Sequence, residues 1–350
     1  MDPTAPLLEA EGLTKQFRLG RSLGEWVRRG PIRALHAVDS VSLTVRAGET
    51  VGLVGESGSG KTTLGRMIAG LDRPSAGRIR LEGREVATMT RAERTFVFRT
   101  VQMVFQDPFA SLDPRQSVAD IIREPLDIHR IGDRGQRRRR VEELLDQVAL
   151  PRRYASRLPH ELSGGLRQRV GIASALALGP KLIVADEPTS ALDTSVQAEI
   201  INLLSDLQRA TGVALLFISH NLDVVRYISH RVAVMYLGRI VELGDVTRVS
   251  EDAQHPYTQA LLSAVPAPDP TNPLTPAQLS GDIPSPIDLP SGCAFHPRCW
   301  LAEDVCRQQV PPLYAFDPTH RAACHITAAA RGAVAPGSEE MPVDASGARD

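Results

Sequence analysis

The feature that most constrains this chain is a glycine-rich stretch that fits the pattern G-x-x-x-x-G-K-[ST]. It reads Gly55-Glu56-Ser57-Gly58-Ser59-Gly60-Lys61-Thr62. Before it, the run from Thr50 to Val54 is rich in β-branched residues and is typical of a buried central strand. After it, the residues from Thr63 to Leu71 have a helical composition. Strand, glycine-rich loop and helix in this order predict a phosphate-binding loop in an α/β fold.

The residue types in this loop suit the phosphates of a nucleotide. Glycines allow backbone N–H groups to turn inward around phosphate oxygens, and the following helix adds the positive end of its dipole. Lys61 is a compact charge that can reach the β and γ phosphates, and the hydroxyl of Thr62 is a ligand for Mg²⁺. We therefore expect ATP and Mg²⁺ as cofactors, bound along the stretch from Gly55 to Thr63.

A second motif supplies the carboxylates that a nucleotide-hydrolysing site needs in addition to the phosphate loop. The apolar strand Leu182 to Ala185 runs directly into Asp186 and Glu187. We expect Asp186 to hold Mg²⁺, directly or through water, and Glu187 to polarise the attacking water as general base. The sequence therefore predicts an ATPase.

The composition is that of a globular protein and narrows its partners. The chain has 350 residues, of which 42% are hydrophobic and 23% are charged, and a net charge of -1. Its length favours about two domains, and its charge gives no reason to expect nucleic acid as a partner. No apolar run approaches the roughly 20 residues of a membrane span, and Met1-Asp2-Pro3-Thr4 does not resemble a secretory signal. We expect a soluble, cytoplasmic chain.

Changes of character along the chain suggest three regions. Strands alternate with helices up to about residue 250, which predicts a parallel, helix-covered sheet. Residues 251–327 contain every cysteine and form a predicted C-terminal domain. Residues 328–350 have almost no large apolar side chain and are expected to be disordered.

A segment between the two nucleotide motifs carries a family resemblance. Leu162-Ser163-Gly164-Gly165 resembles the signature motif of ATP-binding cassette (ABC) ATPases. Gln106 matches the Q-loop glutamine of that family, and His220 matches its switch histidine. Phe17 stands where the family stacks an aromatic ring on adenine, and Ser190-Ala191-Leu192-Asp193 looks like its D-loop.

This resemblance implies a P-loop ABC ATPase core of the α/β class. It implies an antiparallel β subdomain, an α-helical subdomain at about residues 107–165 and a small C-terminal extension. By resemblance Gln106 senses Mg²⁺ and the γ-phosphate, His220 contacts the γ-phosphate, and the signature faces ATP held by a second subunit. The implied catalytic residues are Lys61, Gln106, Glu187 and His220, and the implied nucleotide contacts are Phe17, Gly55 to Thr63, Ser163, Gly164, Gly165 and Asp193.

The signature departs from the family at its fifth position, where Leu166 replaces a common glutamine. Loss of that amide removes a polar contact worth about 1 kcal/mol. Ser163, Gly164 and Gly165 are intact and precede a helix, whose N-terminus suits an anion. We therefore expect the composite site that uses this signature to be active but weaker.

All four cysteines of the chain lie close together in sequence, at positions 293, 299, 306 and 324. Stable disulfides are not expected in a cytoplasmic protein. Four thiolates suit an iron–sulfur cluster or zinc, although the C-x₂-C pairs of zinc ribbons are absent. Unliganded thiols are the remaining alternative.

The C-terminal region resembles that of oligopeptide and dipeptide importer ATPases. The similar segments are His255-Pro256-Tyr257-Thr258, Ile283-Pro284-Ser285-Pro286, Gly292 to Cys299, and the Q-loop segment from Gln106 to Arg115. Some members of this subfamily carry a [4Fe–4S] cluster here, which implies that Cys293, Cys299, Cys306 and Cys324 are its ligands. The long Q-loop segment resembles that of the F-type ATPase subunit.

The subfamily resemblance also implies partners and a location. It implies a second ABC ATPase subunit (a different one, with a homodimer as the alternative), two permease subunits and, indirectly, an extracytoplasmic substrate-binding protein. The chain is then a peripheral protein at the cytoplasmic face of the inner or plasma membrane. The alternatives are a nickel or glutathione importer ATPase, or an accessory ABC ATPase of phosphonate breakdown that does not transport.

Overall fold

The computed structural model describes residues 5–18, 34–90, 92–264 and 282–336. The chain forms two compact units. The first contains Met1–Ile240 together with Pro284–Leu289, and the second contains Val241–Ile283 and Pro290–Asp350. The units therefore divide ahead of the predicted boundary at residue 250, and one short segment of the predicted C-terminal domain belongs to the first unit.

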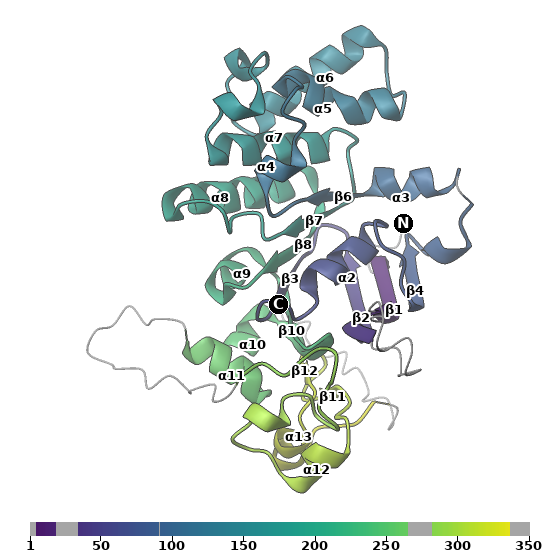
Figure 1. Cartoon of the computed structure of the whole chain (residues 1–350), viewed down its shortest axis with the longest axis vertical. Coiled ribbons are helices and arrows are strands. Elements are labelled where there is room, and N and C mark those ends of the chain that lie inside the picture. The colour runs from purple at the N-terminus through teal and green to yellow at the C-terminus, as the bar shows by residue number, and fades with distance from the viewer. Residues whose placement is uncertain (1–4, 19–33, 91, 265–281, 337–350) are drawn as a thin grey trace, which may run out of the picture. The chain divides into compact units, whose positions relative to one another are not determined.

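A parallel sheet forms the centre of the first unit (Figure 1). Its strands run in the order β9-β3-β8-β7-β6, and their bounds are β3 (Thr50–Val54), β6 (Val101–Val104), β7 (Leu182–Asp186), β8 (Ala214–Ser219) and β9 (Arg231–Tyr236). Every residue of β3, β7 and β8 is buried, as expected for a parallel sheet with helices packed on it. The helices α2 (Lys61–Ile68), α8 (Thr194–Thr211) and α9 (Leu222–Ile228) alternate with these strands. The alternation predicted from the sequence is confirmed.

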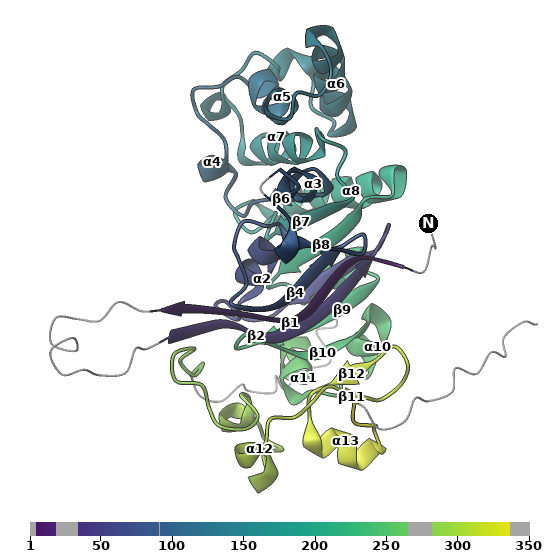
Figure 2. The same cartoon turned by 90° about the vertical axis from the view of Figure 1, so that its right-hand side faces the viewer.

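The second layer of this unit is an antiparallel sheet in the order β2-β1-β4-β5 (Figure 2). Its strands are β1 (Pro6–Arg18), β2 (Ala34–Arg46), β4 (Ala76–Leu81) and β5 (Arg84–Glu85). A short 3₁₀ turn, Val86–Thr88, and α3 (Arg94–Thr100) then lead back to the parallel sheet. The register places Phe17 of β1 opposite Leu35 of β2. This is the antiparallel β subdomain that the resemblance implied.

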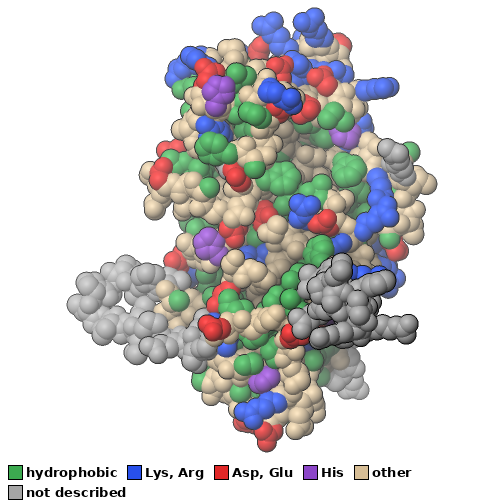
Figure 3. Space-filling model, in the orientation of Figure 1, with side chains coloured by type: hydrophobic (Ala, Val, Ile, Leu, Met, Phe, Trp, Pro, Cys, Tyr) green, Lys and Arg blue, Asp and Glu red, His purple; other side chains and the backbone are tan. Residues whose placement is uncertain are grey.

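A group of helices lies between β6 and β7 in the sequence and occupies the top of Figure 1. Its members are α4 (Pro108–Ser111), α5 (Val118–Ile128), α6 (Arg134–Gln147) and α7 (Gly164–Leu176), with 3₁₀ turns at Arg152–Tyr154 and Pro159–Glu161. Apolar side chains such as Ile122 and Leu144 are fully buried between them. Basic side chains lie among acidic and apolar ones on the outer surface of this part (Figure 3), and Arg138 pairs with Glu142 at 3.2 Å. A helical subdomain is present, as the resemblance implied, and its last helix continues to Leu176, beyond the expected end at about residue 165.

The second unit is small, and the carboxylate of Glu242 forms a buried polar centre in it. A three-stranded antiparallel arrangement joins β10 (Arg239–Asp245), β12 (Arg321–Ala322) and β11 (Tyr314–Ala315). The helices are α10 (Val246–Glu251), α11 (Pro256–Ser263), α12 (Asp304–Gln308) and α13 (His325–Arg331), with a 3₁₀ turn at His296–Arg298. Glu242 is fully buried and accepts hydrogen bonds from the backbone N–H groups of Gln254 and His255 and pairs with His320 Nε2 at 2.7 Å.

The predicted disordered tail, 328–350, needs a correction over its first residues. Helix α13 continues to Arg331, and Val334 forms a β-bridge with Ala315. The small side chains of Ala328 and its neighbours favour a helix because they lose little rotamer freedom. The rest of the predicted tail, from residue 337 onward, lies outside the described residues. Within the described part of the chain, no helix has the length and apolar character needed to cross a membrane.

Candidate functional site

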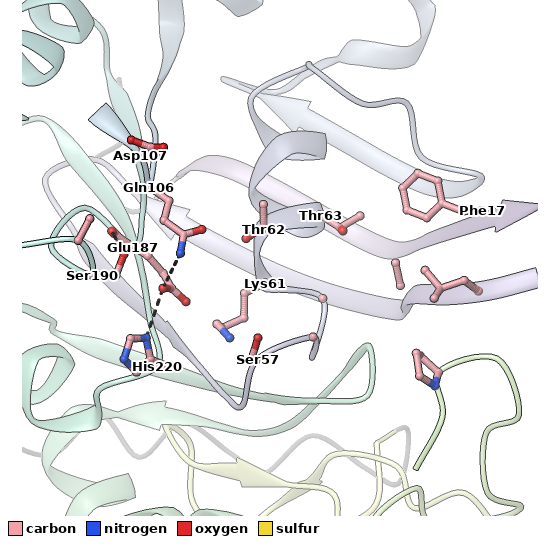
Figure 4. A pocket seen from close by; sticks show the side chains of 16 residues that line it. Phe17, Ser57, Lys61, Thr62, Thr63, Gln106, Asp107, Glu187, Ser190 and His220 are labelled. Carbon is pink, nitrogen blue, oxygen red and sulfur yellow. Dashed lines mark hydrogen bonds and ion pairs between the residues drawn. The ribbon is translucent and has the colours of Figure 1, made fainter. Parts of the chain in front are cut away.

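A cavity of about 860 Å³ in the first unit holds most of the predicted site residues (Figure 4). Its walls come from the phosphate loop, from β1 and β2, and from the segments that follow β6, β7 and β8. In Figure 4 Phe17 lies at one end, Lys61 lies in the middle, and Glu187 and His220 lie at the other end. The predicted residues that line it are Phe17, Ser57, Gly58, Gly60, Lys61, Thr62, Thr63, Gln106, Glu187 and His220.

The phosphate loop is folded around the ammonium group of Lys61. Lys61 Nζ donates hydrogen bonds to the carbonyl oxygens of Gly55 at 2.7 Å and Glu56 at 2.9 Å. Gly60 has a φ of 102°, and a Cβ there would lie 2.0 Å from the Ala37 carbonyl oxygen, so this position requires glycine. Burial lowers the pKa of Lys61, while the nearby carboxylates of Glu187 and Asp186 act in the opposite sense.

Thr62 and Asp186 meet although they are far apart in sequence. Thr62 Oγ1 donates to Asp186 Oδ1 at 3.1 Å, which joins the first turn of α2 to the end of β7. Asp186 is buried, and this burial raises its pKa more than the hydrogen bond from Thr62 lowers it. A hydroxyl and a carboxylate are hard oxygen donors of the kind that Mg²⁺ prefers, and the two groups converge on one point. The pair therefore fits the predicted metal.

Two further predicted residues, Gln106 and His220, converge on the carboxylate of a third, Glu187. Glu187 Oε2 accepts a hydrogen bond from Gln106 Nε2 at 3.2 Å and lies 3.3 Å from His220 Nδ1. Glu187 has a φ of 44°, a left-handed conformation that is uncommon for a side chain other than glycine. Its backbone N–H donates to the Ile218 carbonyl oxygen at 3.0 Å, which holds this turn against β8. The three side chains can together position a water molecule and one phosphate group.

The signature and the D-loop aspartate are not among the residues that line this cavity. Ser163 is the N-cap of α7, where its Oγ accepts a hydrogen bond from the N–H of Leu166 at 3.4 Å. Asp193 is the N-cap of α8 and accepts from the N–H of Val196 at 3.0 Å. A Cβ on Gly165 would lie 2.4 Å from Val196 Cγ1, so this glycine lets α7 approach α8 closely. Gly164 is the first residue of α7.

Several residues of the cavity were not among the nucleotide contacts predicted from the sequence, although most of them lie in segments that the family resemblance singled out. Leu35, Ala37 and Pro286 line it close to Phe17, and Asp107, Ser190 and Ala191 line it elsewhere. Leu35 could have been found from hairpin pairing with Phe17, because the two strands are antiparallel neighbours. Pro286 lies in a segment that resembles importer ATPases, but nothing in that segment points to a nucleotide, because the cassette motifs lie far away in the sequence.

The four cysteines are neighbours in the second unit. Burial raises the pKa of the Cys293 and Cys299 thiols to about 11, and the charges of the other thiols add to the effect. The backbone N–H of Cys293 donates to the carbonyl oxygen of Cys306 at 2.8 Å. Among the described residues, however, no three or more His, Cys, Asp or Glu side chains are grouped so that they could hold a metal ion. As placed, the four thiols do not fit a metal, and the predicted iron–sulfur cluster or zinc ion is not supported.

Fold and site together define an ATPase of the ATP-binding cassette class. Residues 38–190 match the family model described as "ABC transporter", and residues 241–306 match the one described as "Oligopeptide/dipeptide transporter, C-terminal region". Together with a relative that is 48% identical over nearly the whole chain, these matches place the chain in the family of ABC transporter ATP-binding proteins, in the branch that carries this C-terminal region.

Relatives match along nearly the whole chain. The oligopeptide transport ATP-binding protein AppF of Bacillus subtilis is 48% identical, with 91% of this chain and 97% of that protein covered. The di/tripeptide transport ATP-binding protein DppF of Pseudomonas aeruginosa is 45% identical, with the same coverage. Among solved structures, the dimeric ATP-binding cassette MJ0796 in a post-hydrolysis state bound to ADP and Pi superposes with a TM-score of 0.60 at 30% identity, covering 68% of this chain and 98% of that one.

Proposed function

We propose that this chain is the ATP-hydrolysing subunit of an ABC importer for di- and oligopeptides. The observation that carries the proposal is the match of residues 241–306 to the oligopeptide/dipeptide transporter C-terminal region. A second observation supports it, since the nucleotide cavity contains the polar side chains expected of an ATPase. The peptide names of the relatives AppF and DppF support the cargo class.

The hydrolytic step follows from the positions of the side chains. Lys61, held by the carbonyl groups of its own loop, turns to the β and γ phosphates when ATP enters. Thr62 and Asp186 would hold Mg²⁺, which supplies positive charge against the phosphate oxygens. Glu187 accepts a proton from the water whose oxygen bonds to the γ-phosphorus, while the bond from that phosphorus to the β–γ bridging oxygen breaks and ADP leaves. Gln106 and His220 keep the Glu187 carboxylate in place beside the γ-phosphate.

The signature serves the nucleotide of a second subunit in this proposal. Ser163, Gly164 and Gly165 lie outside the cavity of their own chain and begin a helix, which suits contact with a phosphate from outside. The related cassette MJ0796 is a dimer in its post-hydrolysis state bound to ADP and Pi, which supports pairing of two ATPase subunits. We propose a different ATPase as the partner, with a homodimer as the alternative.

The segment from Gln106 to Arg115 is proposed to contact the permease subunits. Phe109 in this segment is 64% exposed. Beneath it, the guanidinium group of Arg167 lies 3.5 Å from the centre of the Phe109 ring, so the segment is attached to the signature helix α7. Two permeases and, through them, an extracytoplasmic binding protein complete the proposed importer, and they place this subunit at the cytoplasmic face of the membrane.

The four cysteines are neighbouring thiols, and we treat them together as one candidate cofactor site. A [4Fe–4S] cluster on these thiols is proposed from the family resemblance alone, because the thiols as placed are not grouped around a metal ion. No catalytic step depends on the cluster. Anaerobic purification followed by iron analysis and absorbance near 400 nm tests it, with a Cys293→Ser variant as the control. Protein that lacks both bound iron and this absorbance would remove the cluster from the proposal.

Uptake by a deletion strain tests the cargo. Wild-type chain, but not Glu187→Gln, should restore uptake of labelled di- and oligopeptides when it is expressed with its permeases. Restored uptake of nickel or glutathione alone would favour those importers instead. A gene neighbourhood with two permease genes and a binding-protein gene is expected, and its absence would favour an accessory ATPase that does not transport.

A further inference from the structure

One residue of the nucleotide cavity comes from far outside the cassette sequence. Pro286 lines the cavity, yet it lies beyond Val241, where the second unit begins. The segment Pro284–Leu289 belongs to the first unit, whereas the residues on both sides of it belong to the second. The chain thus returns to the ATPase core for a few residues, and the hydrolytic step described above makes no use of them.

A main-chain hydrogen bond places this segment beside Phe17, the ring that the family resemblance assigns to adenine stacking. The backbone N–H of His36, in β2, donates to the Pro286 carbonyl oxygen at 3.0 Å. In the register of β1 with β2, His36 faces Gln16, and the next pair is Leu35 with Phe17. Pro286 is therefore attached to β2 directly next to the pair that contains Phe17.

The segment is suited to hold a fixed apolar surface. The ring of proline is part of its backbone and restricts φ, so the position of the backbone also fixes the position of the ring. Ser285 Oγ accepts a hydrogen bond from the N–H of Ile287 at 3.2 Å, which closes a turn around Pro286. Pro286 is half-buried and Phe17 is 40% exposed, with Lys15 Nζ lying 5.1 Å from the centre of the Phe17 ring.

These contacts give the cavity two chemically different ends. Phe17, Leu35, Ala37 and Pro286 contribute apolar surface, whereas Lys61, Glu187 and His220 carry the polar and charged groups. Figure 4 shows Phe17 well separated from Glu187 and His220, with Lys61 between them. A nucleotide has the same division, because its base is flat and weakly polar and its phosphates are charged.

We propose that Pro286 is a base-binding residue, whose ring contacts the adenine of ATP together with Phe17. The C-terminal segment Pro284–Leu289 thus completes the nucleotide site of the ATPase core. This inference rests on the ATPase class of the chain and is independent of peptide as the cargo.

The test compares Pro286→Ala with wild type in the full chain, using two ligands. ATP carries the base, and inorganic tripolyphosphate offers the phosphates without it. We expect the variant to raise the Kd for ATP about fivefold, the effect of losing a small apolar contact, and to leave the Kd for tripolyphosphate unchanged. Phe17→Ala should give the same pattern, and its effect should be larger because the ring is larger.

Pro284→Ala is the matched control, since Pro284 lies in the same segment but does not line the cavity. It should bind both ligands as wild type does. Equal weakening of ATP and tripolyphosphate by Pro286→Ala, or no weakening of ATP, would overturn the inference. Circular dichroism shows whether each variant is folded, and ATP binding by the wild type shows separately that the nucleotide site itself is intact.

Discussion

At the scale of single residues, Glu187 combines a reactive position with an unfavourable backbone. Its φ of 44° costs of the order of 1 kcal/mol in a residue with a side chain. The conformation aims the carboxylate at Gln106 and His220, each within 3.3 Å of Glu187 Oε2. Backbone strain of this kind is tolerated where the surrounding structure holds it, here by the hydrogen bond from the Glu187 N–H to Ile218.

Glu187→Gln should separate binding from hydrolysis. The amide has almost the same shape and retains the contacts of the side chain, but it cannot accept the proton of the attacking water. We expect ATP binding to be unchanged and the ATPase rate to fall by about 10²-fold or more, with ATP trapped in a closed dimer. Size-exclusion chromatography with ATP and a phosphate-release assay measure the two effects. Turnover at the wild-type rate would contradict the role of Glu187 as general base.

Leu166 is the second residue at which a single change is informative. Its backbone N–H donates to Ser163 Oγ, so the cap of α7 does not depend on the side chain. Leu166→Gln adds an amide beside the signature, worth about 1 kcal/mol, and should raise the ATPase rate of the assembled complex about fivefold. Leu166→Met is the matched control, since it changes shape without adding an amide. An unchanged rate in Leu166→Gln would disprove the idea that the natural leucine weakens the site.

At the scale of elements, side-chain caps begin three helices, and each capping residue belongs to a motif predicted from the sequence. Ser163 caps α7, Asp193 caps α8 and His255 caps α11, each through a side-chain acceptor that binds a backbone N–H group. Such caps contribute about 1 kcal/mol each and determine where a helix begins. The His255 cap is unusual, because the ring is fully enclosed and accepts the N–H of Tyr257 at its Nδ1.

The His255 cap predicts a pH-dependent stability. Burial lowers the pKa of His255 from 6.5 to about 3, so the folded chain keeps this ring neutral. Between these two values the unfolded chain binds a proton that the folded chain does not, so stability is lost as the pH falls below about 6.5. The contribution reaches about 2 kcal/mol at pH 5.

His255→Asn keeps a capping side chain but cannot titrate, so it is the informative variant. Chemical denaturation at pH 7 and pH 5 gives the free energy of unfolding of both proteins. The variant should lose less stability than wild type between the two pH values. An equal loss in the two proteins would show that His255 does not cause the acid sensitivity.

The elements that could be predicted from the sequence are those whose signal is local. The phosphate loop and the motif ending in Asp186 and Glu187 are local, because each depends on a strand and the few residues after it. Gln106 and His220 required resemblance to a family, since a single glutamine or histidine carries no local signal. Pro286 and the pair of Glu242 with His320 could not be predicted, because their partners lie far away in sequence and depend on tertiary packing.

At the scale of the whole molecule, the proposed use of the signature on a second subunit would make each nucleotide site a composite of two chains. Lys61 lines the cavity of its own chain, whereas Ser163 does not. A chain that uses its signature on a partner can therefore bind ATP alone but needs the partner for fast hydrolysis. In this proposal the assembly, and not the single chain, is the catalytic unit.

Ser163→Arg tests this arrangement. The bulky charge should block the neighbouring subunit's site, so the ATPase rate of the assembled complex should fall by at least about tenfold. ATP binding by the isolated variant should equal that of wild type, because Ser163 is outside the cavity of its own chain. Fluorescent ATP titration and phosphate release measure these two quantities. Loss of ATP binding in the isolated chain would contradict a role for Ser163 in the partner's site.

The return of Pro284–Leu289 to the first unit has a consequence for how such proteins can be recombined. A chimera that joins the first 240 residues of one cassette to the C-terminal region of another takes this segment from the wrong parent. Pro286 would then come from one parent, whereas Phe17 and His36 would come from the other. Exchange of the C-terminal region without loss of nucleotide affinity should therefore require two junctions more than a simple fusion, one on each side of the segment.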